Sequence, residues 1–317
     1  MRPTGKLHLG HYVGALENWV NLQKDYDNFH LIADYHVLTT QHDTSEIKQN
    51  TLDMLLDWLA SGIDPEQSPI FRQSAIKEHS ELFLLLSMLV TSARLERNPT
   101  LKDQVRDLKI DNMSYGHLGY PVLQSADILL YRGDLVPVGQ DQAPHVEIAR
   151  ELARRFNRLY GKVFPEPEVM LTKYSRLPGL DGQSKMSKSL NNAILISDDP
   201  EIITRKMKKA RNDPQKLREN DPGRPDHCLV FTYHETFNVQ ASEEIASDCR
   251  AGNIGCGDCK AICASAIADV LQPVRERREA YLGKSDDLMD ILLAGEKQAG
   301  EIAQNTMAAV RTAMDLG

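Results

Sequence analysis

No segment of this 317-residue sequence is apolar for long enough to span a bilayer. The longest strongly apolar run lies around Leu82–Val90 and is interrupted by Ser87, whereas a membrane-spanning helix needs about 20 residues. The N-terminus also lacks a basic start followed by an apolar stretch and a small-residue cleavage site, the pattern of an export signal. We therefore expect a cytoplasmic protein with no membrane partner.

Positive charge is in deficit, because 37 Lys and Arg residues face 45 Asp and Glu residues, a net charge of −8. A general DNA-coating protein needs a positive potential, so we expect no DNA partner, although one RNA bound to a local basic face is compatible with this charge. The apolar fraction of 41% and the charged fraction of 26% are those of a globular protein. Disordered, collagen-like and small disulfide-stapled chains are thereby excluded, and the length predicts about two domains.

Strand-like and helix-like segments alternate through the first half of the sequence. Short apolar runs at Phe29–Ala33 and Pro69–Arg72 predict buried parallel strands. Apolar residues at helical spacing predict helices after Gly10, over residues 47–61 and over Lys77–Thr91, and Asp43 with Glu46 resembles a capping box for the second of these. This alternation predicts an α/β fold with a Rossmann-like, doubly wound parallel sheet. The sequence from about residue 189 onward has almost entirely helical patterning.

A glycine- and histidine-containing turn, Pro3-Thr4-Gly5-Lys6-Leu7-His8-Leu9-Gly10-His11, stands directly before the first predicted helix. Glycine lets the backbone approach a ligand closely, and the N–H groups at a helix N-terminus attract phosphate. His8 and His11 can donate hydrogen bonds to phosphate or ribose oxygens. An exposed loop with two histidines remains the alternative for these side chains taken alone.

A second motif, Lys185-Met186-Ser187-Lys188-Ser189, follows a glycine-rich turn. Two lysines beside two hydroxyls suit a pyrophosphate leaving group, because the ammonium charges neutralise it and the hydroxyls orient it. A solvated charged loop is the simpler alternative, but a fixed string of five residues is more specific than a lone glycine pattern.

Together the two motifs resemble the signatures of class I aminoacyl-tRNA synthetases. The resemblance extends over nearly the whole chain and is closest to the bacterial tryptophanyl-tRNA synthetase family, through the residue ranges 3–16, 33–36, 95–98, 120–129 and 136–142. It implies a homodimer that activates L-tryptophan with ATP and Mg²⁺ and transfers it to tRNA(Trp), releasing AMP and pyrophosphate. It also implies catalytic roles for Lys185, Lys188, His8 and His11. The ATP-binding residues that it implies are Arg2, Pro3, Thr4, His8, Gly10, His11, Gly139, Gln140, Asp141, Lys185, Met186, Ser187, Lys188 and Ser189.

A tryptophan pocket can be argued partly from chemistry, since indole offers one N–H donor and no acceptor. A selective pocket should hold one buried acceptor among apolar walls, and Asp127 lies in an apolar stretch at the position that the resemblance assigns to this acceptor. A carboxylate on a helix surface is the alternative for Asp127 without the resemblance. The remaining pocket residues that the resemblance implies are His36, Tyr120, Gln124, Val136, Val138 and Gln142.

Two departures from the family concern the nucleotide side of the site. Family members carry a short apolar strand before the turn at Pro3, where this sequence has only Met1 and Arg2. We expect the missing strand to leave ladder hydrogen bonds unpaired and to remove one wall of the pocket. Gln140 stands where glutamate is common, which removes one negative charge near the ATP site.

All five cysteines lie in the last third of the sequence, and four of them, Cys228, Cys249, Cys256 and Cys259, have the spacing C-x20-C-x6-C-x2-C. In a cytoplasmic chain this clustering favours a metal site over disulfides. Four thiolates can hold zinc or an iron–sulfur cluster, and spacing alone does not decide between them. The pattern resembles that of tryptophanyl enzymes with a [4Fe–4S] cluster beside the anticodon-binding region, although the first gap is shorter here. Cys263 is predicted to be a buried apolar residue.

These observations predict two domains: residues 1–188 as the Rossmann-like catalytic domain with a helical dimer-interface insertion, and residues 189–317 as a helical anticodon-binding domain with the cysteine cluster. The basic stretch from Arg205 to Arg218 is either a tRNA phosphate contact or a solvated helix face. Two alternatives to the tryptophan–tRNA ligase remain open, a tyrosyl-type synthetase and a catalytically impaired paralogue that binds tRNA or protein.

Overall fold

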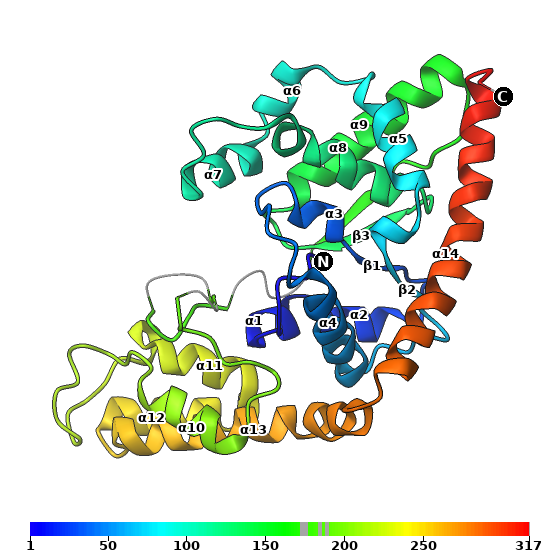
Figure 1. Ribbon diagram of the computed structural model, residues 1–317. Coiled ribbons are helices and arrows are strands. Elements are labelled where there is room, and N and C mark those ends of the chain that lie inside the picture. Colours follow the sequence, from blue (N-terminus) through cyan, green and yellow to red (C-terminus); the bar gives the residue numbers. More distant parts are fainter. Residues whose placement is uncertain (172–176, 183–185, 188–189, 317) are drawn as a thin grey trace.

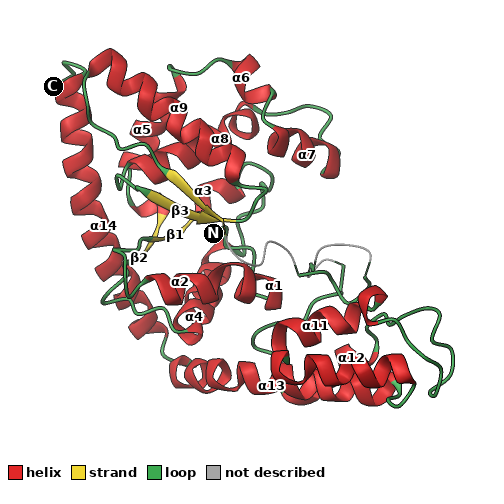
Figure 2. Cartoon of the chain, turned by 180° about the vertical axis from the view of Figure 1, so that it is seen from behind, coloured by secondary structure: helices red, strands yellow, loops and turns green. Residues whose placement is uncertain are grey.

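The computed structural model describes residues 1–171, 177–182, 186–187 and 190–316. The strands within these residues form two parallel pairs. β1 (His30–Ile32) pairs with β2 (Ile70–Arg72), and β3 (Leu135–Val138) pairs with β4 (Glu168–Leu171). The α/β class is confirmed, with the difference that the described ladders form two separate pairs instead of one continuous sheet (Figure 2).

Helices connect the strands and cover both sides of them, which is the arrangement that parallel strands require. A π-helical turn over Tyr12–Leu16 joins the first two helices, and a 3₁₀ turn over Gln73–Ala75 follows β2. The helices of this part are α1 (Leu9–His11), α2 (Glu17–Leu22), α3 (Asp34–Val37), α4 (Ile47–Ser61), α5 (Glu78–Ser87), α6 (Ser92–Glu96), α7 (Pro99–Asp107), α8 (Tyr115–Leu129) and α9 (Ala143–Tyr160).

The part of the chain after residue 190 is helical, as its patterning predicts. Two 3₁₀ turns, Pro225–His227 and Val239–Ala241, lie between its longer helices. These helices are α10 (Pro200–Lys208), α11 (Leu229–Phe237), α12 (Ser242–Ala251), α13 (Cys256–Tyr281) and α14 (Ser285–Ala313).

The last helix, α14, runs back along the strands of the first part (Figure 1). Its residues Ala299, Ala303 and Met307 are fully buried in one core cluster with Phe71 of β2. A second cluster joins the first two helices to α10, α11 and α13. The domain boundary at residue 188 stays a prediction, but the packing places α14 with the strands of the first part.

The strands predicted around residues 30 and 70 are present, and Gly62 ends α4 with a φ of 109°. The capping box predicted for α4 is wrong. Glu46 is the N-cap without a side-chain hydrogen bond, and Asp43 instead accepts a hydrogen bond from the Ser45 N–H at 2.9 Å. The short Asp43 side chain therefore closes a turn before the helix instead of capping it.

Met1 lies beside β1 on the edge that β2 does not use. Its ammonium group donates to the Leu31 carbonyl at 2.7 Å, and its carbonyl accepts from the Ala33 N–H at 2.8 Å. These are the contacts of a parallel ladder, so two of the hydrogen-bonding groups that we expected to be unpaired on β1 have a partner.

Candidate active site

The first sequence motif forms a turn that leads into α1. Pairing with a later segment holds it on both sides: the Leu9 N–H donates to the Ile194 carbonyl at 2.9 Å, and the Ile196 N–H donates to the Leu7 carbonyl at 3.0 Å. His8 stands opposite Leu195 in this antiparallel bridge and is buried. The bridge therefore fixes the motif against the stretch of chain that directly follows the second motif.

Within the second motif the structure describes Met186 and Ser187, whereas Lys185, Lys188 and Ser189 lie outside the described residues. Met186 is buried in the core cluster that contains the first motif. A Cβ atom on Gly10 would lie 3.8 Å from the Met186 Cβ, and 3.0 Å from the His8 ring. The two motifs are therefore in contact, and a side chain at position 10 would crowd the ring of His8.

Asn192 organises the second motif and was not identified from the sequence. Its Oδ1 accepts from the Ser187 N–H at 2.7 Å, and its Nδ2 donates to the Asp181 carboxylate at 3.0 Å. It packs so closely on Gly179 that a Cβ there would lie 2.2 Å from Nδ2. The run Gly179 to Gly182 before the motif was the available signal, because glycine often marks such a close approach.

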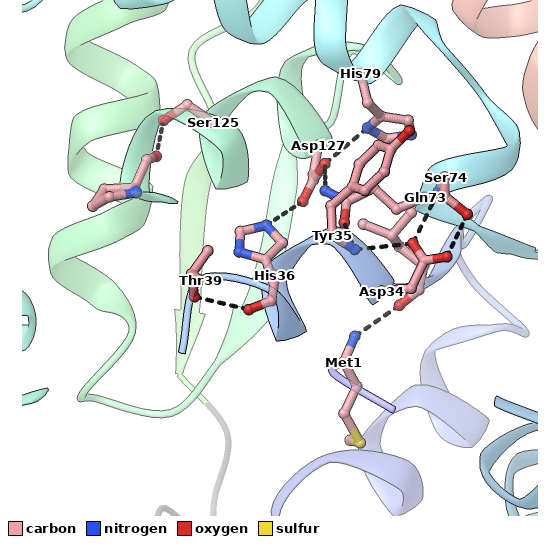
Figure 3. A network of polar contacts seen from close by, with 12 residues as sticks. Met1, Asp34, Tyr35, His36, Thr39, Gln73, Ser74, His79, Ser125 and Asp127 are labelled. Carbon is pink, nitrogen blue, oxygen red and sulfur yellow. Dashed lines mark hydrogen bonds and ion pairs between the residues drawn. The ribbon is translucent and has the colours of Figure 1, made fainter. Parts of the chain in front are cut away.

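Asp127, on α8, lies at the centre of a polar network (Figure 3). Its Oδ2 is 2.9 Å from His36 Nε2. Its Oδ1 is 2.7 Å from Gln73 Nε2 and 2.8 Å from His79 Nδ1. The Asp127 side chain is only 8% exposed, so the carboxylate is a buried acceptor of the kind that the indole argument requires.

The network keeps this carboxylate ionised. Burial alone would raise the pKa of Asp127, but the hydrogen bonds from His36 and His79 outweigh it and hold that pKa below its usual range. Gln73 and His79 were missed from the sequence, since neither lies in a stretch that resembles a motif.

The other predicted pocket residues lie on neighbouring elements. Tyr120, on α8, makes an edge-on ring contact with His36, and its hydroxyl is 2.8 Å from His145 Nε2. Val136 and Val138 are half-buried and share one face of β3, because side chains alternate along a strand. Gln124 lies one helical turn before Asp127, and no contact places its side chain more closely.

The residues predicted to touch the nucleotide after β3 form a turn. The Gln142 N–H donates to the Gly139 carbonyl at 2.9 Å, and the Gln142 side chain donates to Asp141 Oδ2 at 3.1 Å. Thr100, on α7, donates to the Asp141 carbonyl at 2.7 Å. Gln140 is exposed. Arg2 and Thr4 are also exposed, whereas Pro3 is buried.

A cavity of about 360 Å³ lies beside this site and not around Asp127. Asp34 lies next to both the cavity and the Asp127 network. It lines the cavity, and its carboxylate accepts hydrogen bonds from Ser74, the neighbour of Gln73, and from the N–H of Tyr35, the neighbour of His36. Other residues that line the cavity are Thr44, Ile47, Lys48, Thr51, Leu52, Arg72, Met289 and Leu292.

The four spaced cysteines lie in or directly before three helices, and all four are free thiols that are half-buried. Cys228 precedes α11, Cys249 lies on α12, and Cys256 and Cys259 lie in the first turn of α13. Burial, and then the charges of the other three thiols, raise the pKa of Cys259 to about 12. Over the described residues, no group of three or more His, Cys, Asp or Glu side chains is arranged to hold a metal ion.

Two side-chain nitrogen atoms lie beside the thiols of Cys256 and Cys259. Asn212 Nδ2 donates to Cys256 Sγ at 3.4 Å, and His234 Nε2 lies 3.4 Å from Cys259 Sγ. A Cβ on Gly223 would lie 2.5 Å from Cys249 Sγ, so only glycine leaves room for that thiol. Cys263 is fully buried among apolar residues, which confirms the prediction for it.

Residues 1–272 match the model of the family described as tRNA synthetases class I (W and Y). This chain belongs to that family. It is 46% identical to the tryptophan–tRNA ligase of Thermotoga maritima, over 100% of this chain and 98% of the relative, and 42% identical to that of Aquifex aeolicus, over 100% and 98%. Among solved structures, it is similar to tryptophanyl-tRNA synthetase from Campylobacter jejuni in complex with ADP and tryptophan, with a TM-score of 0.88, 34% identity and coverage of 100% and 98%. None of the helices in the described ranges is long and apolar enough to cross a membrane.

Proposed function

We propose that this chain is a tryptophan–tRNA ligase, which activates L-tryptophan with ATP and transfers it to tRNA(Trp) in the cytoplasm. The observation that carries the proposal is the bridge between His8 and Leu195, which holds the first signature segment of the family against the stretch of chain that follows the second. The names of its relatives support tryptophan as the amino acid, and the buried acceptor Asp127 is consistent with it.

The reaction has two steps. A tryptophan carboxylate oxygen attacks the α-phosphorus of ATP, the bond from that phosphorus to the bridging oxygen breaks, and pyrophosphate leaves with the electron pair. The 2′-hydroxyl of the terminal adenosine of tRNA then attacks the carbonyl carbon of the adenylate. The bond from that carbon to the phosphate oxygen breaks, AMP leaves with the electron pair, and the hydroxyl proton passes to the leaving phosphate or to solvent. Both steps depend mainly on positioning and charge stabilisation. Mg²⁺ bound with ATP would supply positive charge at the phosphates.

The nucleotide is assigned to the first motif, the turn after β3 and the second motif. His8, Gly10 and His11 would hold the phosphates and ribose, with Arg2, Pro3 and Thr4 beside them. Gly139, Gln140 and Asp141 would contact the nucleotide from the other side. The charge that develops on pyrophosphate is assigned to Lys185 and Lys188, with Met186, Ser187 and Ser189 completing the loop.

Tryptophan is assigned to the pocket at Asp127. In the proposed complex the indole N–H donates to the Asp127 carboxylate. The preference over an analogue without a donor follows from the cost of leaving this acceptor position of a buried carboxylate empty. The walls of the pocket are His36, Tyr120, Gln124, Val136, Val138 and Gln142.

The helical part from residue 189 is proposed to read the anticodon of tRNA. Several exposed basic residues of the stretch from Arg205 to Arg218 support a phosphate-binding face, namely Arg205, Lys208, Lys209, Arg211 and Arg218. Lys206 and Lys216 have other partners: Lys206 pairs with Asp198 at 2.6 Å, and Lys216 donates to the Ile254 carbonyl at 2.9 Å.

A homodimer is proposed through α5 and the start of α8. Leu84 and Met88 lie four residues apart, on one face of the α5 segment, and are 55% and 68% exposed. Tyr115, the first residue of α8, is 70% exposed. Exposed apolar side chains that share one helix face, as Leu84 and Met88 do, favour contact with another protein surface.

The cysteine site is proposed to hold a [4Fe–4S] cluster with a structural role, with zinc as the alternative. The donor set and the nitrogen donors beside Cys256 and Cys259 fit a cluster, whose sulfurs accept hydrogen bonds. A cluster also holds its cysteines further apart than a single zinc ion does. Iron, sulfide and zinc analysis of protein purified without oxygen tests this: about four irons per chain supports a cluster, one zinc supports the alternative, and neither metal rejects the site.

Amino-acid-dependent exchange of labelled pyrophosphate into ATP tests the ligase itself. We expect exchange with tryptophan and little with tyrosine, followed by charging of tRNA(Trp). Exchange that prefers tyrosine would identify a tyrosyl-type enzyme, and exchange with neither would favour the paralogue. Lys185→Ala and Lys188→Ala should each slow exchange far more than they weaken tryptophan binding; equal losses in both would contradict their assigned role.

A further inference from the structure

The carboxylate of Asp127 has three hydrogen-bond partners from the protein. Gln73 Nε2 and His79 Nδ1 both lie on Oδ1, at 2.7 and 2.8 Å, and His36 Nε2 lies on Oδ2, at 2.9 Å. A carboxylate oxygen accepts about two hydrogen bonds. Oδ1 is therefore fully used by Gln73 and His79, and Oδ2 retains capacity for one more donor.

His79 is completely enclosed, because its side chain is 0% exposed. Its second ring nitrogen, Nε2, is 2.8 Å from the hydroxyl of Tyr131. The ionised carboxylate can only accept, so Nδ1 must carry the proton that points to Asp127. In the neutral ring, Nε2 then accepts from the Tyr131 hydroxyl, and this second bond fixes the tautomer.

Tyr131 is suited to remain a donor. Burial, and then the charge of Asp127, raise the pKa of its phenol above the usual range. Its ring stacks on Phe29 and packs against Phe71, with centroid separations of 5.2 and 5.0 Å. The ring of His79 packs against both Phe71 and Tyr131. Aromatic packing thus holds the rings of Tyr131 and His79, and with them the hydrogen bonds from Tyr131 to His79 and from His79 to Asp127, in one orientation.

We propose that His79, oriented by Tyr131, is a positioning residue for amino-acid selection: it occupies Oδ1 of Asp127, so that Oδ2 is presented to the indole N–H. The proposal rests on the proposed role of Asp127. Without His79, Gln73 alone occupies Oδ1, so this oxygen can recruit water or compete with Oδ2 for the substrate donor, and the carboxylate no longer offers a single acceptor position. The energetic advantage of a substrate with an N–H donor over one without it should then fall.

The readout is the ratio between KM or Kd for tryptophan and for its benzothiophene analogue, which replaces the indole N–H by sulfur. A loss of fold or of pocket shape weakens both ligands together, whereas a loss of acceptor geometry weakens tryptophan alone. We expect His79→Leu to reduce this discrimination roughly tenfold. His79→Asn, which places an amide N–H near the position of Nδ1, should restore most of it. Tyr131→Phe should give a smaller reduction with the fold retained.

Two comparisons complete the experiment. Phe29→Leu disturbs the packing of the Tyr131 ring but removes no hydrogen bond, so the discrimination should fall less than with Tyr131→Phe. Asp127→Asn tests the underlying assignment: if it leaves the ratio unchanged, the role of Asp127 in the proposed function is wrong. If Asp127→Asn lowers the ratio but His79→Leu and Tyr131→Phe weaken tryptophan and the analogue equally, only the role of His79 is overturned. A urea transition measured for each variant separates these effects from unfolding.

Discussion

The carboxylate of Asp57, in the middle of α4, accepts a hydrogen bond from the backbone N–H of Leu7 at 2.8 Å. Leu7 is the residue before His8, so a helix distant in sequence fixes the entry into the first motif. Asp57 is fully buried, and its other oxygen is 3.0 Å from Arg278 Nε on α13. One buried carboxylate therefore connects the first motif to α13, the long helix that carries two of the clustered cysteines, Cys256 and Cys259.

Removal of Asp57 should be costly. Asp57→Ala leaves the Leu7 N–H and the Arg278 guanidinium without their partner, and we expect a loss of about 3–5 kcal/mol in the free energy of unfolding. Urea denaturation measures it. Asp53→Ala, one turn earlier on the same helix, removes a carboxylate that accepts an exposed hydrogen bond from Gln49, and should change stability by less than about 0.5 kcal/mol. Similar losses for the two variants would show that the buried contact contributes nothing of its own.

Asn192 should influence ATP chemistry without touching tryptophan. Asn192→Ala removes the acceptor for the Ser187 N–H and opens space beside Gly179, so the second motif loses its support. We expect the rate of pyrophosphate exchange to fall about tenfold, with the Kd for tryptophan unchanged. The matched control is Asn191→Gly, at an exposed position with a φ of 52° that glycine adopts readily. Full activity of Asn192→Ala would remove Asn192 from the site.

Stability should increase with pH between about pH 5 and 6.5. Burial lowers the pKa of His30 to about 3 and that of His145 to about 4. Both rings are neutral in the folded chain, while the unfolded chain binds protons as pH falls through the ordinary histidine pKa, so protonation favours unfolding. The stability that neutral His30 and His145 contribute is fully present above about pH 6.5 and is lost progressively below it. Urea midpoints across this range measure the slope; a flat profile would contradict the burial of these two rings in the neutral form.

The proposed dimer can be tested on α5. Met88→Asp places a charge in a patch with Leu84, and desolvating that charge on association is unfavourable. Sedimentation should show mostly monomer for this variant and dimer for the unmodified chain. Leu217→Asp is the comparison, because Leu217 is 85% exposed but belongs to the helical part. A variant at Met88 that remains dimeric would place the interface elsewhere.

Local patterns in the sequence predicted local structure well. The strand at His30–Ile32, the end of α4 at Gly62 and the burial of Cys263 all follow from apolar spacing or from one conformational preference. The motif at His8 and the acceptor at Asp127 could be chosen because they resemble known signatures. The capping box failed because Asp43 had an equally good local partner, the Ser45 N–H.

The rest depends on contacts between residues far apart in sequence. Gln73 and His79 lie 54 and 48 residues from Asp127, and Asp57 lies 50 residues from Leu7. No periodicity connects such pairs. The contacts of Asp127 form only when α5, α8 and the turn after β2 pack together, and that of Asp57 forms only when α4 packs against the first motif. The supporting residues of the site are therefore visible in the structure and not in the sequence.

Gly295 shows the same dependence in a form that can be measured. Gly in a helix interior is usually destabilising by about 1 kcal/mol relative to Ala, but Gly295 of α14 lies against β2 so closely that a Cβ would stand 2.1 Å from the Ile70 carbonyl oxygen. Gly295→Ala must push the helix away from the strand, and we expect a loss of more than about 2 kcal/mol in the free energy of unfolding. Gly300, on the same helix, has no atom within 4 Å of its Cβ position. Gly300→Ala should therefore stabilise the chain by up to about 1 kcal/mol. Opposite signs for these two identical substitutions, five residues apart, would establish that α14 is seated directly on β2; a gain at both positions would show that it is not.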